Sequence, residues 1–180
     1  MKNVMVDLET VGMRPGCGIL SIGAVFFDDK KLGQEFYQVV NIESCYKLGL
    51  HTDQLTVVWW SSQSVEARKV FDDSLANRGL DIADALTQFN NFLRTGTGSP
   101  KVWGNGADFD NAILAVAYAL TGVKPGWKPY DGRCYRTLKG FLPTTKITRQ
   151  GTHHNALDDA KSQAEHAITV LNALRLGSKL

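Results

Sequence analysis

Apolar residues occur in short continuous runs near the start of the chain and at helical spacing further along it. The run at 4–6 predicts a short buried strand, and the runs at 19–27 and 35–42 predict a hairpin joined through residues 28–33. Helical spacing of apolar residues follows, interrupted by one more short strand. The predicted helices cover 52–60, 64–71, 82–93 and 108–120, the strand covers 101–103, and a last helix after Asn155 closes the chain.

This order of elements predicts an α/β domain built on a mixed β-sheet, with α-helices on both faces. The chain contains no repeat, low-complexity tract or long linker, so residues 1–180 are expected to form a single domain. A domain of this length buries roughly two-thirds of the surface that its unfolded chain exposes. A hydrophobic core therefore suffices, without disulfides or structural metals.

Composition says more about the expected location of the protein than about its partners. A net charge of +2 and a pI near 8.4 are mild, whereas nucleic-acid-binding domains often exceed a pI of about 9. The three cysteines, Cys17, Cys45 and Cys134, form no Cys-x-x-Cys pair, which favours a reducing compartment and free, buried or half-buried thiols. The longest apolar run, at 112–120, is far shorter than the ~18 residues of a membrane span. We expect a cytoplasmic protein with no membrane contact.

Candidate chemistry begins with Asp7 and Glu9, at the end of the first predicted strand. Because they are two residues apart in a strand, both side chains point to the same face of the sheet. A lone Asp-x-Glu pair is more often the polar edge of a surface strand. Here the pair ends an apolar strand, where two negative charges repel each other unless a positive charge is present. A hard cation such as Mg²⁺ supplies that charge.

The helix predicted at 108–120 carries two aspartates near its start. Its core arc, plotted at about 100° per residue, contains Phe109, Ile113, Val116, Ala117 and Leu120. Asp110 lies at the edge of this arc and Asp108 lies on the far side. Asp108 is therefore explained as an exposed first-turn acid that interacts with the helix dipole. Asp110 is either a buried acid paired with a basic residue or an acid that converges with others.

The segment His153–Asp159 opens the last helix. Asn155 is a predicted N-cap and Asp158 a first-turn acid three residues later, as in a capping box. Asp159 has no such explanation, because it flanks the core arc, whereas Asp158 lies nearly opposite it. That arc contains Ala160, Ala164, Ala167, Leu171 and Leu174.

Zinc is an alternative for the adjacent histidines of this segment. Two neighbouring imidazoles rarely reach one ion, however, and no well-spaced cysteine pair completes such a site. We therefore interpret His153 as a solvated residue.

Together these three segments resemble the DnaQ-like DEDD exonuclease superfamily, which includes polymerase proofreading subunits, ribonuclease T and oligoribonuclease. Its first motif, Asp-x-Glu-Thr, matches Asp7–Thr10, and its second, Asn-x-x-x-Phe-Asp, matches Asn105–Asp110. Its third, His-x-Ala-x-x-Asp, matches His154–Asp159. The histidine five residues before the last aspartate is typical of the DEDDh branch. Each motif alone is weak evidence, but three in this order over most of the chain are strong.

The resemblance implies a ribonuclease H-like fold and a 3'-to-5' exonuclease that uses two divalent cations, Mg²⁺ or Mn²⁺. The implied substrate is the 3' end of single-stranded DNA or RNA, released as nucleoside 5'-monophosphates. The implied metal ligands are Asp7, Glu9, Asp110 and Asp159, with Asp110 acting mainly through water. The implied general base is His154. The implied contacts to the terminal nucleotide are Leu8, Thr10 and Phe109.

Segments between the motifs resemble a phage and bacterial subgroup described variously as exoribonucleases or exodeoxyribonuclease VIII-like proteins. The similar segments are 21–27, 59–60 with 64–68, and 102–106. One departure is Cys134, which stands where relatives usually have aspartate. Cys134 is not an implied metal ligand, so catalysis is expected to survive, while any substrate preference set by this segment stays open. Many relatives are homodimers, and the resemblance leaves that partner open as well.

Trp59 and Trp60 are further candidate substrate contacts, since a tryptophan can stack on an unpaired base for about 1–3 kcal/mol. The alternative is packing in the core, but two adjacent helical residues do not both face it. The densest group of basic residues lies just before the last motif and either binds the phosphate backbone or forms a solvated face. It consists of Arg133, Arg136, Lys139, Lys146 and Arg149.

Two other functions are compatible with this fold. One is a nucleic-acid-binding protein with weak catalysis or none, and the complete set of acids argues against it. The other is an endonuclease like ribonuclease H, whose acids come in another order and which lacks the His-x-Ala-x-x-Asp helix. The sequence does not distinguish DNA from RNA, because no motif reports a contact to the sugar 2'-hydroxyl.

Overall fold

The apolar strand at the start of the chain becomes β1 (Asn3–Thr10), the central strand of a five-stranded sheet in the computed structural model, which describes residues 1–106 and 108–177. The sheet order is β3-β2-β1-β4-β5. β2 (Ile19–Phe27) and β3 (Leu32–Val39) are antiparallel to their neighbours, while β4 (Lys101–Gly104) and β5 (Gly132–Cys134) add in parallel on the other side of β1. The predicted α/β fold with a mixed sheet is confirmed.

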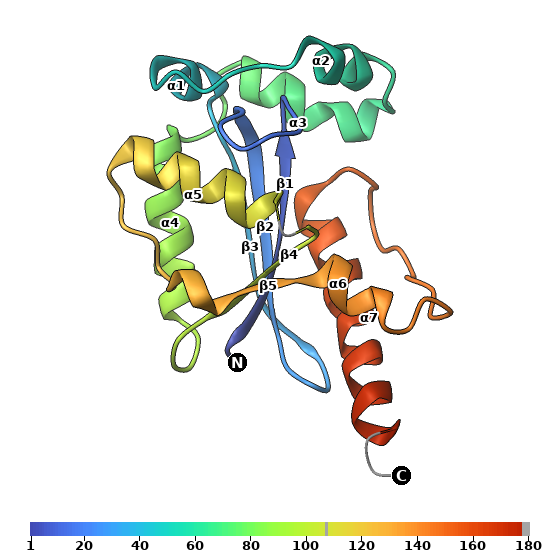
Figure 1. Ribbon diagram of the computed structural model, residues 1–180. Coiled ribbons are helices and arrows are strands. Elements are labelled where there is room, and N and C mark those ends of the chain that lie inside the picture. The colour runs from blue at the N-terminus through green and yellow to red at the C-terminus, as the bar shows by residue number, and fades with distance from the viewer. Residues whose placement is uncertain (107, 178–180) are drawn as a thin grey trace.

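Helices cover both faces of this sheet (Figure 1). One face carries α4 (Ile82–Arg94) and α5 (Asp110–Thr121), and the other carries α6 (Tyr135–Gly140) and α7 (Ala156–Gly177). The shorter helices α1 (Ile42–Lys47), α2 (Gln54–Ser61) and α3 (Val65–Leu75) lie together at the end toward which β1 points (Figure 1). A 3₁₀ turn, Pro129–Asp131, precedes β5.

Alternation along β1 divides the core into two parts. Val4, Val6 and Leu8 belong to the cluster that includes α4 and α5 residues. Met5 points the other way, into a cluster with Ala160 of α7. Since side chains two apart share a face, Asp7 and Glu9 continue the row of Met5 toward α7.

The predicted boundaries agree at β2 and differ at several other elements. The strand predicted at 35–42 lies at Leu32–Val39, because the Asn41 side chain accepts a hydrogen bond from the Glu43 N–H and starts α1, which was not predicted. The short elements between 129 and 140 were also missed. Each of them is three to six residues long, too short to show a period.

The predicted core arcs of the two long helices need partial correction. α5 begins at Asp110 rather than Asp108, and its buried face includes Tyr118, whose hydroxyl donates to Asn90 Oδ1 of α4 at 2.8 Å. Leu120, predicted to be buried, is 46% exposed as a result. On α7 the buried face ends at Val170, and Leu174, also predicted to be buried, is 37% exposed.

Gly23 of β2 sets how closely α7 approaches the sheet. It pairs with Asp7 across the β1–β2 ladder. A Cβ atom at this position would lie 2.2 Å from the carbonyl carbon of Ala156 and 2.3 Å from the backbone nitrogen of Leu157. Only glycine therefore lets the first turn of α7 rest on β2 directly beside Asp7.

The cysteines and the surface agree with the composition. All three cysteines are free thiols, Cys17 and Cys45 buried and Cys134 half-buried.

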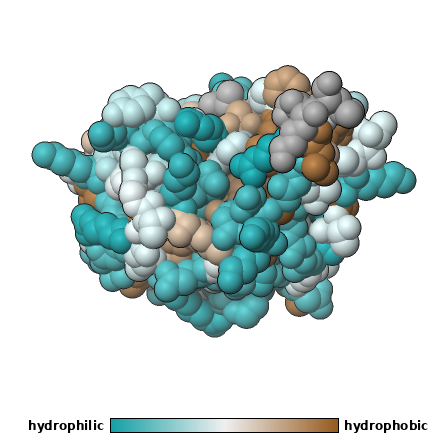
Figure 2. All heavy atoms as spheres, turned by 90° about the horizontal axis from the view of Figure 1, so that it is seen from below, coloured by the Kyte–Doolittle hydropathy of each residue, from teal (hydrophilic) through white to brown (hydrophobic). Residues whose placement is uncertain are grey.

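Polar side chains dominate the face seen in Figure 2, which lies at the bottom of Figure 1, away from the end toward which β1 points. Among the helices of residues 1–106 and 108–177, none combines the length and the apolar character needed to cross a membrane.

Replacing Gly23 with alanine should destabilise the fold, because the new methyl group would overlap backbone atoms of α7. Overpacking typically costs on the order of 1–3 kcal/mol, and urea unfolding should show a loss of this size. Gly177→Ala, in open space at the end of the same helix, is the control and should leave the midpoint unchanged. An unchanged midpoint for Gly23→Ala would contradict the close docking of α7.

Candidate active site

Three carboxylates from two elements meet beside the C-terminal half of β1. Asp7 and Glu9 come from β1, and Asp159 comes from the first turn of α7. One carboxylate oxygen from each of the three residues lies within 4.8 Å of the other two. The three acids converge because Gly23 admits the first turn of α7 to the sheet.

Asp110 reaches the site from α5 and is 1% exposed. Its Oδ1 accepts the Leu8 N–H of β1 at 3.1 Å, and its Oδ2 accepts the Asn105 N–H at 2.6 Å. The β1–β4 pairing ends at Met5 and Trp103, so the carboxylate satisfies a backbone donor that β4 leaves free. Two N–H donors therefore fix this acid at the edge of the cluster.

Asp159 is also held at both oxygens. Its Oδ2 accepts the His154 N–H at 3.0 Å, and its Oδ1 forms an ion pair with Arg149 Nη1 at 2.7 Å. The Asp159 side chain is 11% exposed, whereas that of Arg149 is 51% exposed. Arg149 belongs to the basic group noted in the sequence, but its pairing with a site acid was not predicted.

Gln163 is a member of the site that sequence reasoning missed. It lies on α7 four residues after Asp159, one helical turn along the same face. Its Nε2 donates to Asp7 Oδ1 at 2.7 Å. Its Oε1 is buried and has no hydrogen-bond partner. The spacing from Asp159 was the available signal.

Burial raises the pKa values of Asp7, Glu9 and Asp110, and repulsion from neighbouring acids adds to this effect for Asp7 and Glu9. Burial, followed by the charges of the other three acids, raises the pKa of Asp7 well above its usual value. The same causes, burial first and then Asp159 and Asp110, raise the pKa of Glu9 to about 8. Burial raises the pKa of Asp110 to about 6, against the lowering effect of its backbone donors. The cluster thus favours a bound cation.

His154 lies just before α7 with a left-handed backbone, φ 64°, which is uncommon for a residue other than glycine. Its ring meets the Trp59 ring edge-on, with centroids 4.7 Å apart. Burial first, and then the neighbouring His153, lower the pKa of His154. A lowered pKa favours the neutral imidazole, the form that accepts a proton.

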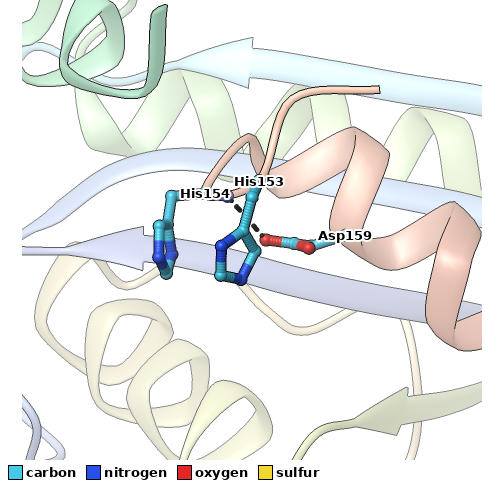
Figure 3. A group of neighbouring side chains, drawn as sticks. All are labelled: His153, His154 and Asp159. Carbon is cyan, nitrogen blue, oxygen red and sulfur yellow. Dashed lines mark hydrogen bonds between the residues drawn. The ribbon is translucent and has the colours of Figure 1, made fainter. Parts of the chain in front are cut away.

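His153 is exposed, as expected, but its ring lies against that of His154, with centroids 3.7 Å apart. Ring nitrogens of both histidines and an Asp159 oxygen lie within 4.8 Å of one another, so the two imidazoles do converge (Figure 3). This second group shares Asp159 with the acidic cluster. The three carboxylates offer only hard oxygen ligands, which suit Mg²⁺ and Mn²⁺.

A cavity of about 1170 Å³ opens over the acids. Asp7, Glu9, Asp159 and His154 all line it. The five residues that the sequence assigned to substrate contact also line it, namely Leu8, Thr10, Phe109, Trp59 and Trp60. The cavity therefore joins the acids to the candidate contacts in one site.

The two tryptophans differ in what they offer to a ligand. Trp60 is 1% exposed, and its indole N–H donates to the Thr10 carbonyl at 2.9 Å. Trp59 is 40% exposed. As the helical geometry requires, only one of the pair is in the core, and Trp59 is the one that is accessible to a ligand.

Four of the five basic residues of the predicted cluster line the cavity: Arg136, Lys139, Lys146 and Arg149. Arg133 instead donates to the carbonyls of Tyr130 and Gly132. Cys134, the departure from the family pattern, caps α6 by accepting the Thr137 N–H at 3.4 Å. The cysteine therefore serves as the N-cap of α6, a position for which aspartate is also a preferred residue.

The two neighbouring aspartates lie outside the cluster. Asp108 is exposed, as predicted, but it precedes α5 instead of lying in the first turn of the helix. Asn155 caps α7 by accepting the N–H groups of Leu157 and Asp158. Asp158 accepts the Thr152 N–H at 2.8 Å rather than closing a capping box, so its role is structural with a different partner.

Comparison with known proteins gives a family and a fold. The family model of the 3'-5' exoribonuclease Rv2179c-like domain matches residues 2–171. An exodeoxyribonuclease of Enterobacteria phage T4 is 25% identical over 125 residues, which cover 63% of this chain and 54% of that protein. The chain thus spans about half the length of this curated relative.

Solved structures of two exonucleases share the fold. The nuclease domain of 3'hExo, a DEDDh family member, bound to rAMP, superposes with a TM-score of 0.64 at 14% identity, covering 95% of this chain and 92% of that one. Exonuclease X in complex with 5' overhanging duplex DNA gives 0.59 at 17% identity, with 95% and 92% covered. The expected ribonuclease H-like fold is confirmed.

The metal-free protein should lose stability as pH rises. Folded Glu9 keeps its proton up to about pH 8, whereas unfolded Glu9 releases it near its ordinary pKa of 4.5, so stability falls between these values. Thermal melts in a chelator should show this decline, and Mn²⁺ should oppose it. Glu9→Gln should flatten the decline, and the exposed Asp108→Asn should not. A metal-free stability that rises over this range would contradict the repulsion described.

Proposed function

Since the chain belongs to the family of 3'-5' exoribonuclease Rv2179c-like domains, with the fold of DEDDh exonucleases, we propose that it removes nucleotides from the 3' end of single-stranded nucleic acid and releases nucleoside 5'-monophosphates. The observation that carries this proposal is the convergence of Asp7, Glu9 and Asp159 in one cavity with His154 beside them. A protein that only binds nucleic acid does not require clustered, mutually repelling carboxylates.

Divalent cations fit the donor set of this cavity. Asp7, Glu9 and Asp159 would hold them directly, and Asp110, whose oxygens serve backbone N–H groups, would act mainly through water. Two such cations supply the positive charge that activates a water and stabilises the leaving oxygen of the phosphodiester. Mg²⁺ and Mn²⁺ both match the hard oxygen ligands.

His154 is the proposed general base. Its lowered pKa keeps the imidazole neutral at physiological pH, and its backbone N–H is tied to Asp159, which holds it next to the acids. In this role the ring accepts the proton of the attacking water. Asp159 would therefore orient the base as well as bind the cation.

The terminal nucleotide would lie against Leu8, Thr10 and Phe109, with Trp59 stacking on a base from the rim. Trp60 would support Trp59, which it meets edge-on. The cavity-lining Arg136, Lys139 and Lys146 would neutralise backbone phosphates. Of the two exonuclease structures that share the fold, one contains rAMP and the other a 5' overhanging duplex DNA. The proposed substrate is therefore a free 3' end of either RNA or DNA.

A degradation assay tests the activity directly. With Mg²⁺ or Mn²⁺, 5'-labelled single strands should shorten progressively from the 3' end, and a chelator should stop the reaction. Matched DNA and RNA strands in parallel reactions determine which sugar is preferred. Internal cuts would instead indicate an endonuclease, and binding without shortening would favour the nucleic-acid-binding alternative.

Substitution of neighbouring aspartates tests the site. Asp110→Asn and Asp159→Asn should abolish turnover, because each removes a charge from the cluster. Asp108→Asn and Asp158→Asn are the matched controls and should retain most activity, since asparagine still offers Thr152 an acceptor oxygen. His154→Ala should lower kcat by about 10²–10⁴-fold without lowering the Tm much. Activity lost in the controls and kept in the site variants would overturn the assignment.

A further inference from the structure

Gln163 is a buried amide that forms a hydrogen bond at only one of its two polar ends. The residue is 5% exposed and lines the cavity over the acids. One end of its amide is used, since Nε2 donates to Asp7 Oδ1 at 2.7 Å. The other end is not, since buried Oε1 lacks a partner. A buried polar atom left in this state normally costs free energy, so it calls for an explanation.

The orientation of the amide follows from the charge around it. If the group were turned over, Oε1 would face the Asp7 carboxylate, and two acceptors would repel each other. The amide nitrogen therefore points to Asp7.

The Asp7 carboxylate is held by fewer hydrogen bonds than those of Asp110 and Asp159. Asp110 is fixed by two backbone N–H groups, and Asp159 by one backbone N–H and Arg149. For Asp7, in the part of the chain that the structure describes, the recorded side-chain hydrogen bond is that from Gln163. Without it, the carboxylate would be free to rotate away from the charges of its neighbours.

We infer that Gln163 is a positioning residue of the metal site, whose Nε2 holds the Asp7 carboxylate toward the other acids. The inference rests on the proposed function for the identity of the site. The amide suits this place because it is neutral, whereas a carboxylate would add a further negative charge to the cluster. Groups that orient metal ligands in this way typically change metal affinity by about 10–100-fold when removed.

Manganese binding without nucleic acid tests the inference apart from catalysis. Gln163→Met keeps the length of the side chain and removes both polar ends. Calorimetry should show Mn²⁺ binding at least about 10-fold weaker than in the unchanged protein. Gln150→Met is the matched control, since Gln150 also pairs its amide with a carboxylate, that of Glu165, but does not line the cavity. Its Mn²⁺ affinity should be unchanged.

Turnover supplies a second measurement. For Gln163→Met the Mn²⁺ concentration at half-maximal rate should rise by a similar factor, while saturating Mn²⁺ restores kcat, because the reacting groups are intact. Equal Mn²⁺ affinity in the two proteins would overturn the inference, as would a loss of kcat that saturating Mn²⁺ does not restore. If the methionine variant fails to fold, Gln163→Asn, which retains the amide but is too short to reach Asp7, takes its place.

The outcomes separate this inference from the proposed function. A protein that binds Mn²⁺ through Gln163 but shortens no strand would refute the exonuclease and leave the positioning role standing. A protein that shortens strands with the same Mn²⁺ requirement after Gln163→Met would refute only the positioning role.

Discussion

Repulsion among carboxylates is the constraint around which this structure is organised. Asp7, Glu9 and Asp159 have oxygens within 4.8 Å of one another, and burial removes the water that would screen them. Hydrogen-bond donors oppose the repulsion, and they differ from one acid to the next. Asp110 accepts two backbone N–H groups, Asp159 accepts a backbone N–H and the Arg149 guanidinium, and Asp7 accepts the Gln163 amide. The remaining repulsion favours a bound cation, because the Arg149 guanidinium paired with Asp159 is half exposed.

Each acid depends on a different piece of the fold for its position. β1 presents its pair because it is the central strand, paired on both sides and fixed in register. Asp110 accepts the Leu8 N–H of β1 beyond the point where β4 stops pairing with β1, so the acid caps the edge of the sheet there. Asp159 comes from a helix that is packed through small residues, among them Ala160 and Ala164. The site therefore forms where the C-terminal part of β1 meets the first turns of α5 and α7.

Much of this was predictable from sequence, and the failures have physical reasons. The alternation in β1 and the helical period at Asp110 and Asp159 report the burial of single side chains, and these two acids are more buried than Asp108 and Asp158, as predicted. Gln163 was missed as a partner of Asp7, because a hydrogen bond between residues 156 positions apart leaves no periodic trace. Arg149 was missed as a partner of Asp159, because it lies in an irregular segment before α7 that has no period to place its side chain. The strand before Asn41 was misjudged because a capping side chain, rather than a change of hydrophobicity, ends it.

The motif residues can form the site only if the residue opposite Asp7, here Gly23, is a glycine. None of the motif residues reveals that the strand opposite Asp7 has to lack a side chain for α7 to reach the sheet. A homologue that kept every motif residue but carried a bulkier residue at this position would pass a motif search and still hold its last aspartate away from the strand. Inactive members of such a family are thus to be sought not only among those that have lost an acid, but also among those that have gained a methyl group.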